Sequence, residues 1–430
     1  MSLEEKRILL REMGKKDGAS IKVYEKGGGY KALKKVLKGM SPEEVKEEVT
    51  KARIRGRGGA GFEAGRKWGF LPKDTDKPIY LACNADESEP GTFKDRHIME
   101  HCPHRLVEGC IITCYAIGAK AGYIYIRGEF PHAQRAVEKA LDEAREKNYL
   151  GEKILGTDHD IDIWVHTGAG AYVCGEETGM LSSIEGGRGN PKLKPPFPAV
   201  EGLFKCPTIV NNVETLANVP FVITDGADAF LALGTEDTPG TRVFCVSGHV
   251  EKPGVFEFEC GVSLKDVIDA AGGVWKGKKL KAVVPGGASA PIITADEVDI
   301  PCDFGSMAKA GTIMGSCAIM VMDEDTSIPH MLLNVMEFFA HESCGQCTPC
   351  REGTGWVKKI VKRICDGGGK PEDLDKLVAI ATSYEGMGGL TICGLSDAAA
   401  WPVQSYIKKF RHEFEALIES GQKATAGAAD

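Results

Sequence analysis

Between residues 65 and 232, short strand-like apolar segments alternate with segments in which hydrophobic residues recur at helical spacing. Short apolar runs at residues 78–85, 122–129 and 161–168 have the length and composition of β-strands. Residues 132–148 instead carry apolar side chains at helical spacing, and the apolar run at 109–119 is too short to span a membrane and predicts a buried helix. Strands that alternate with helices in this way predict a layered α/β domain with a largely parallel sheet.

The N-terminal residues 1–64 have a different pattern. They are rich in charged and helix-forming side chains, and a run of three glycines from Gly27 interrupts them. Ser41 followed by Glu44 is the signature of a helix start, because each side chain can bond the other's backbone N–H. We expect residues 1–64 to form an N-terminal helical segment that ends at the beginning of a glycine-rich loop.

The pattern changes again after residue 232. Residues 233–327 open with turn-forming residues and continue as short β-type segments with glycine turns around one helical piece at 263–273, which predicts a small mixed β domain. Residues 328–430 contain four successive helical patterns, which predict a helical bundle. The chain is therefore expected to have boundaries near residues 64, 232 and 327.

Composition limits the classes of function. A chain of 430 residues exceeds the size of one ordinary core and predicts two to four domains. A net charge of −8 argues against a nucleic acid partner, because phosphate binding needs a concentrated basic face. Without a long apolar run or an apolar signal core, we expect a cytoplasmic protein with no direct membrane insertion. The 15 cysteines then predict thiols or metal ligands rather than disulfides.

Three cysteines at three-residue spacing, Cys344, Cys347 and Cys350, are the strongest chemical signal in the chain. Such a loop brings three thiolates to one point, as three corners of a cubane [4Fe–4S] cluster require, and a fourth ligand comes from elsewhere. We expect Cys393 as the fourth ligand, because nearby glycines allow a close approach, and rank Cys365 below it. Four thiolates also suit tetrahedral zinc, so the spacing alone leaves zinc open.

A glycine-rich loop at residues 55–70 is a candidate for binding phosphate. Arg57 and Lys67 add positive charge, and Phe62 and Phe70 offer rings that can stack on a flat ligand. A helical pattern precedes the loop, whereas the dinucleotide fingerprint requires a strand there, so an ordinary Rossmann fingerprint is a poor match. The glycines concerned are Gly56, Gly58, Gly59 and Gly61.

Three further segments carry polar side chains beside predicted strand ends. Loops that follow parallel strands meet at one edge of a sheet, and together these segments predict one nucleotide-like ligand site. The acidic loop contains Asn84, Asp86, Glu87, Ser88 and Glu89. The later segments contain Tyr172, Gly175, Glu176, Glu177, Lys194, Phe197, Asn211 and Asn212.

The chain resembles, over nearly its whole length, the NADH-binding flavoprotein subunit of respiratory complex I. The resemblance rests on four motifs in series: RGRGGAGFEAGRKW, NADESEPGTFKDR, GAYVCGEETGMLSSIEG and ESCGQCTPCREG. It implies a Rossmann-like FMN- and NADH-binding domain at residues 65–232, a ubiquitin-like (β-grasp, SLBB-like) domain at 233–327 and a four-helix bundle with a [4Fe–4S] cluster at 328–430. Diaphorase subunits of NAD-linked hydrogenases and formate dehydrogenases share these motifs and are the alternative.

The family implies an activity, that of NADH:quinone oxidoreductase. Non-covalent FMN accepts a hydride from NADH and passes single electrons to the [4Fe–4S] cluster, and partner subunits carry them towards quinone. Those partners would be a thioredoxin-like [2Fe–2S] subunit and further hydrophilic-arm subunits of complex I, peripheral to the inner membrane. A zinc-bearing structural module and a flavoprotein without an NADH site are the other two function classes.

The resemblance also implies roles for residues. FMN contacts would be Gly56, Gly58, Lys67, Asn84, Asp86, Glu87, Gly175, Glu176, Asn211 and Asn212, within loops that also contain Arg57, Gly59, Gly61 and Ser88. NADH contacts would be Phe62, Phe70, Glu89, Glu177, Lys194 and Phe197, with Tyr172 beside the nucleotides. Glu177 would accept from ribose hydroxyls and repel the extra phosphate of NADPH. From its place in the acidic loop, rather than from the resemblance, we hypothesise that Glu87 tunes the flavin potential by its charge, and it is the expected catalytic residue.

Overall fold

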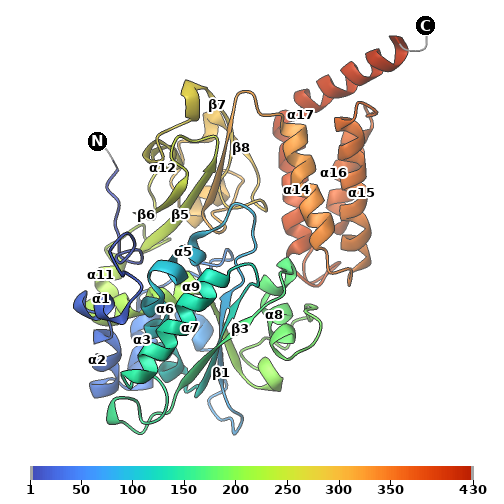
Figure 1. The fold of residues 1–430 in the computed structure, drawn as a ribbon. Helices are drawn as coiled ribbons and strands as arrows, with labels where there is room; N and C mark the ends of the chain where they lie inside the picture. The colour runs from blue at the N-terminus through green and yellow to red at the C-terminus, as the bar shows by residue number, and fades with distance from the viewer. Residues whose placement is uncertain (1–2, 428–430) are drawn as a thin grey trace.

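The computed structural model describes residues 3–427 and contains two sheets and a separate group of long helices (Figure 1). The first sheet has four parallel strands, in the spatial order β3-β2-β1-β4. The strands are β1 (Tyr80–Ala85), β2 (Ala121–Ile126), β3 (Asp162–Thr167) and β4 (Thr208–Asn212). The expected parallel sheet is confirmed, and the three predicted strands are β1, β2 and β3.

Helices bury both faces of this sheet. Successive side chains of a strand point to opposite faces, so Leu81 and Cys83 of β1 join the large core under one layer while Ala82 joins a smaller core with Met180 and Leu181. The first layer includes α5 (Lys94–His101), α6 (Pro103–Ile117), α7 (Pro131–Glu146) and α9 (Val213–Ala217). The smaller core is closed by α8 (Glu177–Ile184).

The N-terminal helices pack onto the same large core. The capping box predicted at Ser41 and Glu44 is present, with both reciprocal bonds formed. Leu33 and Val45 are fully buried in this core, which explains why charged, helix-prone sequence folds here. These helices are α1 (Ile21–Lys26), α2 (Lys31–Gly39), α3 (Pro42–Lys51) and α4 (Ala64–Trp68), joined later in the chain by α10 (Val219–Asp225) and α11 (Ala227–Leu231).

The second sheet is mixed, in the order β6-β5-β9-β7-β8. Its central strands β5 and β9 are parallel, and the other neighbours are antiparallel. The strands are β5 (Thr241–Gly248), β6 (Gly254–Glu259), β7 (Leu280–Val284), β8 (Ile293–Thr294) and β9 (Ala318–Asp323). The helices of this region are α12 (Leu264–Ala270) and α13 (Phe304–Lys309).

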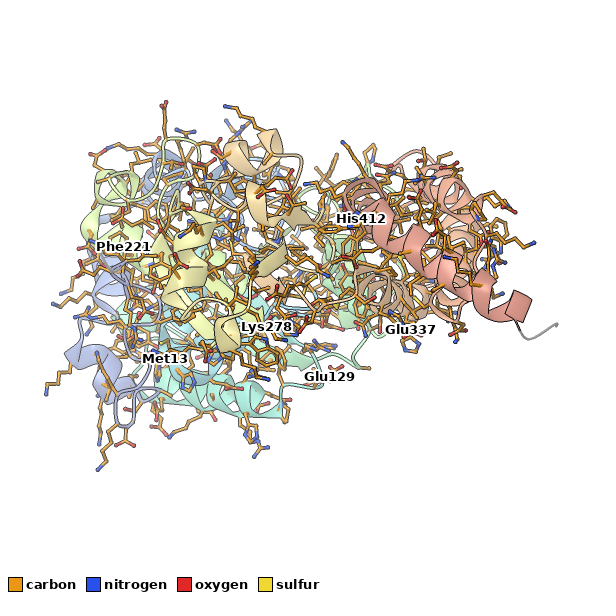
Figure 2. All side chains as sticks on the ribbon, turned by 90° about the horizontal axis from the view of Figure 1, so that it is seen from above. Met13, Glu129, Phe221, Lys278, Glu337 and His412 are labelled. Carbon is orange, nitrogen blue, oxygen red and sulfur yellow. The ribbon has the colours of Figure 1, made fainter. Side chains whose placement is uncertain are left out.

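Four helices follow, each packed against the next and the last against the first. They are α14 (Ile328–Glu342), α15 (Thr348–Cys365), α16 (Asp373–Tyr384) and α17 (Leu395–Gly427), which has non-helical dihedral angles at Phe410. Seen from above, Glu337 and His412 lie at the opposite end of the molecule from Met13 and Phe221 (Figure 2). No described helix is both long and apolar enough to cross a bilayer.

Close contact between α6 and α9 gives a prediction for stability. A Cβ at Gly109 would lie 2.1 Å from the carbonyl oxygen of Leu216, so Gly109→Ala forces the backbones apart. We expect a loss of about 1–3 kcal/mol in the free energy of unfolding, measured by urea titration with circular dichroism.

The matched control is Gly355→Ala on α15. A Cβ there meets no atom within 4 Å, so the same substitution should gain about 0.5–1 kcal/mol by restricting the unfolded chain. Equal effects of the two substitutions would contradict the close packing of α6 on α9.

Candidate functional site

A cavity of about 600 Å³ lies at the carboxyl edge of the parallel sheet. Chain order reverses between β1 and β4, and the strand-end loops diverge there to leave a crevice. The cavity is lined by the loop after β1 and by Asn212, where β4 ends. Its opposite wall comes from residues 286–316 of the second sheet region and residues 393–401 at the start of α17.

The acidic loop after β1 contributes polar atoms without partners to this cavity. Asp86 Oδ2 and Ser88 Oγ are both buried without a well-formed hydrogen bond among the described residues, although Ser88 is close enough to lower the pKa of Asp86. Burial raises the pKa of Asp86 to about 7, although Arg127 opposes the shift. A buried polar atom without a partner is costly, so these oxygens fit a polar ligand in the cavity.

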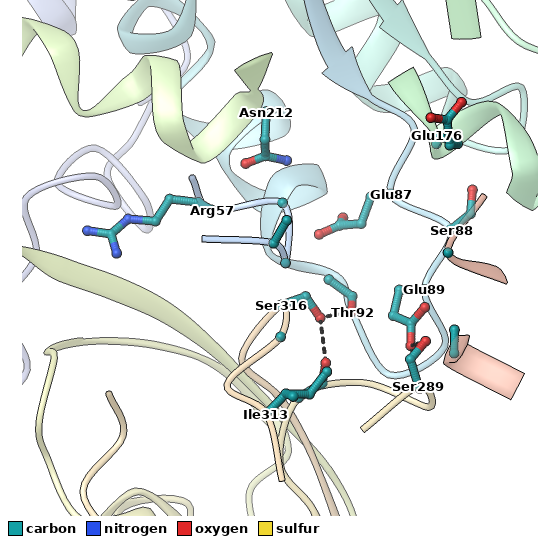
Figure 3. A pocket seen from close by; sticks show the side chains of 18 of the residues that line it. Arg57, Glu87, Ser88, Glu89, Thr92, Glu176, Asn212, Ser289, Ile313 and Ser316 are labelled. Atoms are coloured by element: carbon teal, nitrogen blue, oxygen red, sulfur yellow. Dashed lines mark hydrogen bonds between the residues drawn. The ribbon is translucent and has the colours of Figure 1, made fainter. Parts of the chain in front are cut away.

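Glu87 faces the cavity and also caps α5 (Figure 3). Its carboxylate oxygens accept from the backbone N–H groups of Asp95, at 2.8 Å, and Arg96, at 3.0 Å. Burial and the nearby charge of Asp95 nevertheless raise the pKa of Glu87 to about 8. A carboxyl group that titrates near neutral pH therefore lies beside the ligand space.

The three predicted asparagines have distinct positions. Asn84 lines the cavity and donates to the carbonyl oxygen of Gly175 at 2.8 Å, which joins the loops after β1 and β3. Asn211 is buried behind the wall and accepts from the indole N–H of Trp68 at 2.8 Å. Trp68 itself is fully buried. Asn212 lines the cavity, so only two of the three amides reach it.

The glycine-rich loop presents its backbone to the cavity. Gly59 has φ +127° with no atom within 4 Å of a built Cβ, so its bare backbone can lie against a ligand. Gly61, at φ +70°, is needed for another reason, because a Cβ there would lie 2.6 Å from the Phe304 ring. The Arg57 guanidinium points away from the cavity and donates to the carbonyl oxygen of Pro239 at 3.0 Å (Figure 3).

Glu89 and Tyr172 connect three regions of the chain. The Tyr172 hydroxyl donates to Glu89 Oε2 at 2.8 Å, and the Ser289 N–H and hydroxyl both donate to Glu89 Oε1 at 2.7 Å. The Tyr172 backbone N–H donates to Glu342 at the end of α14. Glu89, Tyr172 and Ser289 line the cavity, whereas Glu342 does not. These bonds therefore fix the walls of the cavity relative to one another.

A charged cluster lies outside the cavity wall. Glu177 bonds Lys67 and Lys194 at 2.8 Å each. Burial alone would raise the pKa of Glu177, but the two lysines hold it below its ordinary value. The nearby loops carry Phe62, Phe70 and Phe197, each about half exposed. The Phe62 and Phe70 rings lie 5.8 Å apart.

The predicted residues therefore fall into two groups. Those that line the cavity are Arg57, Gly58, Gly59, Asn84, Asp86, Glu87, Ser88, Glu89, Tyr172, Gly175, Glu176 and Asn212. Those that do not line it are Gly56, Gly61, Phe62, Lys67, Phe70, Glu177, Lys194, Phe197 and Asn211.

Several lining residues were not singled out from sequence. Thr92, Lys94 and Asp95 lie inside a recognised motif and had that signal, but Ser289 and Ser316 look like ordinary turn residues. The Thr92 and Ser316 hydroxyls lie 2.6 Å apart across two regions of the chain, a contact that no local pattern indicates.

The four predicted cysteine ligands come from two loops at helix starts. Cys347 is the N-cap of α15, Cys350 lies in its first turn and Cys393 precedes α17. Burial raises the pKa of the Cys350 thiol, and Cys344 and Cys347 add to the rise. Burial likewise raises the pKa of Cys393 to about 12, with further contributions from Cys344 and Cys350. The loop with Cys344, Cys347 and Cys350 therefore lies beside the loop with Cys393.

Hydrogen bonds to two sulfurs support a thiolate-bound cluster. The Ile392 N–H lies 3.3 Å from Cys347 Sγ, and the Ser343 hydroxyl lies 3.3 Å from Cys350 Sγ. Cys365 ends α15, fifteen residues after Cys350, so the two lie about 22 Å apart along the helix and cannot share one cluster. No three His, Cys, Asp or Glu side chains of residues 3–427 converge on a point suited to one metal ion.

Comparisons with protein families match most of the chain. Residues 49–221 match the Nuo51 FMN-binding domain, 242–307 an SLBB domain and 330–417 the NADH-ubiquinone oxidoreductase-F iron-sulfur binding region. The last match contains all four predicted cysteine ligands. This match decides for an iron–sulfur cluster over zinc, the alternative that the cysteine spacing had left open.

Solved structures share the fold. The air-oxidized NAD+-reducing [NiFe]-hydrogenase has a chain that matches with a TM-score of 0.81 at 34% identity, covering 97% of this chain and 68% of that one. The H2-reduced state matches with a TM-score of 0.79 at 36% identity, covering 88% of this chain, which spans only 63% of the hydrogenase chain.

Curated relatives match this chain over almost the whole length of both proteins. The NADH-quinone oxidoreductase F subunit numbered 2 of Rhizobium meliloti is 49% identical over 413 residues, 96% of this chain and 97% of the relative. The NADH-quinone oxidoreductase F subunit of Rickettsia massiliae is 47% identical over 423 residues, 98% and 99% of the two chains. Since such identity extends over almost the whole length, the chain belongs to the family of NADH-quinone oxidoreductase F subunits.

Proposed function

We propose that this chain is the NADH dehydrogenase module of a complex I, in which bound FMN accepts a hydride from NADH and releases single electrons to a [4Fe–4S] cluster. One observation carries the proposal: Cys393 and Gly394 line the same cavity as the strand-end loops. A cofactor in the cavity would therefore lie against a cluster ligand.

The chain's own residues would position both nucleotides. We assign FMN binding to the loops with Gly56, Arg57, Gly58, Gly59, Gly61, Lys67, Asn84, Asp86, Glu87, Ser88, Gly175, Glu176, Asn211 and Asn212. We assign NADH binding to Phe62, Phe70, Glu89, Tyr172, Glu177, Lys194 and Phe197. The exposed rings of Phe62 and Phe70 support adenine stacking at the cavity's outer side. Cys344, Cys347, Cys350 and Cys393 would hold the cluster.

The proposal includes an architecture and partners. We assign residues 65–232 to a Rossmann-like domain after an N-terminal segment at 1–64, residues 233–327 to a β-grasp domain and 328–430 to a four-helix bundle. The closed packing of α14, α15, α16 and α17 supports the last assignment. Electrons would pass to hydrophilic-arm subunits, including a thioredoxin-like [2Fe–2S] subunit, in a cytoplasmic complex attached peripherally to the inner membrane.

A diaphorase subunit of an NAD-linked hydrogenase or formate dehydrogenase is the second candidate. The hydrogenase structures favour it by fold, with TM-scores of 0.79 and 0.81. The NADH-quinone oxidoreductase relatives match almost end to end at higher identity, whereas this chain spans only about two thirds of the hydrogenase chains. We therefore place complex I first.

A visible spectrum tests the function directly. The purified chain, reconstituted with FMN, iron and sulfide, should be yellow-brown, and NADH should bleach the flavin band. Cys393→Ser should lose or convert the cubane EPR signal while the flavin band still bleaches. Cys365→Ser, the matched thiol on α15, should keep the signal. A chain that NADH does not bleach contradicts the proposal.

Glu177 gives a test of coenzyme choice. Glu177→Ala leaves Lys67 without its carboxylate partner and Lys194 with only Glu176, at 3.2 Å, so more positive charge faces the place proposed for the adenosine ribose. The extra phosphate of NADPH should then be attracted instead of repelled, raising the ratio of NADPH to NADH kcat/KM about tenfold or more.

The matched control is Glu201→Ala, which removes an exposed carboxylate from the loop that follows Phe197. It should leave the coenzyme ratio unchanged. An unchanged ratio in Glu177→Ala would remove Glu177 from the proposed NADH site.

The tuning proposed for Glu87 depends on whether its carboxyl group carries a charge in the working pH range. Its pKa rises from 4.5 to about 8 on folding, so the folded chain holds the proton more tightly than the unfolded chain. The protonated Glu87 carboxyl therefore contributes its whole stabilisation of the fold below pH 4.5, and this contribution is lost as the pH rises to about 8.

Glu87→Gln removes this titration. Between about pH 5 and 8.5 the free energy of unfolding of FMN-free wild type should fall by roughly 2–4 kcal/mol more than that of the variant, in urea titrations. Parallel pH profiles of the two proteins would show that Glu87 is ionised throughout.

A further inference from the structure

Four buried charged residues and the half-buried Asn212 form a network at the cavity wall, and the proposed chemistry does not use its charged members. We call Lys94, Asp95, Asn212, Glu214 and Arg242 the Lys94 network. Lys94 and Asp95 begin α5, Asn212 and Glu214 lie where β4 passes into α9, and Arg242 belongs to β5 of the second sheet. The network therefore joins two regions of the chain that are far apart in sequence.

Lys94 is the centre of the network. Its ammonium lies 2.7 Å from Asp95 Oδ1 and 2.8 Å from Glu214 Oε2, and its side chain is 1% exposed. Burial alone would lower the pKa of Lys94, but the two carboxylates hold it above its ordinary value, so the ammonium stays charged. Charges this deeply buried are tolerated only when each has a partner.

The network fixes a side chain that faces the cavity. The Asn212 amide N–H donates to Asp95 Oδ2 at 2.7 Å, and its carbonyl oxygen accepts from the Glu214 backbone N–H at 2.9 Å and, in a longer contact of 3.5 Å, from the Lys94 ammonium itself. Both ends of this amide are thus held by residues that Lys94 bonds. Gly58 of the glycine-rich loop packs against Asn212, since a Cβ at Gly58 would lie 3.3 Å from the Asn212 Cβ.

The same network reaches the opposite wall. Glu214 Oε1 accepts from the Val243 backbone N–H at 3.1 Å, and Arg242 Nε lies 3.7 Å from this oxygen. The Arg242 guanidinium donates to the carbonyl oxygen of Gly315 at 3.1 Å, and Gly315 lines the cavity. Lys94 thereby stabilises both walls through Glu214.

Charge balance makes the network sensitive to Lys94. The two positive charges of Lys94 and Arg242 balance the two negative charges of Asp95 and Glu214 within the network. Without Lys94, the two buried carboxylates keep only Arg242, whose nearest ion-pair distance of 3.7 Å is too long for a hydrogen bond, and the more remote charge of Arg57, whose guanidinium bonds Pro239. Asp95 would then lack its counter-ion and lose the position from which it holds Asn212.

We propose that Lys94 is a positioning residue of the FMN site: acting through Asp95 and Glu214, it holds the Asn212 amide towards the cavity and keeps the second sheet region in register with it. The inference rests on the proposed function, because it takes FMN as the ligand of the cavity. If Lys94 has this role, the second sheet region is part of the FMN site and does not merely connect the nucleotide-binding loops to the helices with the cluster.

Lys94→Met tests the proposal, since it removes the charge and keeps most of the volume. FMN dissociation constants are measured by flavin fluorescence quenching on cluster-reconstituted full chain. The variant should bind FMN about tenfold more weakly or worse, as expected for a misplaced hydrogen-bonding group. Wild-type affinity in folded Lys94→Met would overturn the inference, whereas a wild type that does not bind FMN would overturn the proposed function itself.

The control is Arg105→Met, another buried cation of the same region, which pairs with Glu12 at 3.3 Å away from the cavity. It should lower the unfolding temperature but keep the FMN dissociation constant within about threefold of wild type. An equal loss of FMN affinity in Arg105→Met would mean that Lys94 acts only through stability and would overturn the proposal.

A second variant tests the route through Asn212. Lys94→Met with Asp95→Asn removes both charges but leaves an amide oxygen at position 95 to accept from Asn212, so FMN affinity should recover to within about threefold of wild type. If Lys94→Met does not fold, Asp95→Ala and Asp95→Asn replace it. The alanine variant should bind FMN about tenfold more weakly than the asparagine variant, and equal affinities would overturn the proposal.

Discussion

The parallel pairing of β1 with β2 on one side and β4 on the other determines where the chemistry of this chain can lie. Because all four strands run the same way, their carboxyl ends meet at one edge, and the loops leave in opposite directions from β1 and β4. The crevice that results collects the acidic loop, the glycine-rich loop and Asn212. The other walls of the cavity come from residues 286–316 and 393–401, which lie against this edge of the sheet.

Local patterns were sufficient to predict the elements of this arrangement. Short apolar runs predicted β1, β2 and β3, and the Ser41–Glu44 box predicted the start of α3, because each depends on residues close in sequence. The five-residue strand β4 was not predicted as a strand, since its last two residues are polar and its neighbour in the sheet is more than a hundred residues earlier. Cysteine spacing predicted a cluster loop but could not choose its metal.

The composition of the site was harder to predict than its position. Gly61 looked like part of a phosphate loop, but it makes room for Phe304, which lies more than two hundred residues later. The charge of Arg57 looked available to a ligand, yet its guanidinium bonds Pro239. In both cases the deciding partner comes from the second sheet region, and no short-range pattern reports a contact made across such a distance.

The placement of Cys393 explains why three regions have to be joined so rigidly. This cysteine precedes α17 and lines the cavity, while its predicted fellow ligands Cys347 and Cys350 begin α15. A shift of the helices relative to the sheet would move the cluster and the cavity wall together. The hydrogen bonds from Tyr172 to Glu89 and to Glu342 oppose that shift, because one residue holds the acidic loop and the end of α14 at once. Electron transfer between a flavin and a cluster needs a fixed separation, and these contacts supply the constraint.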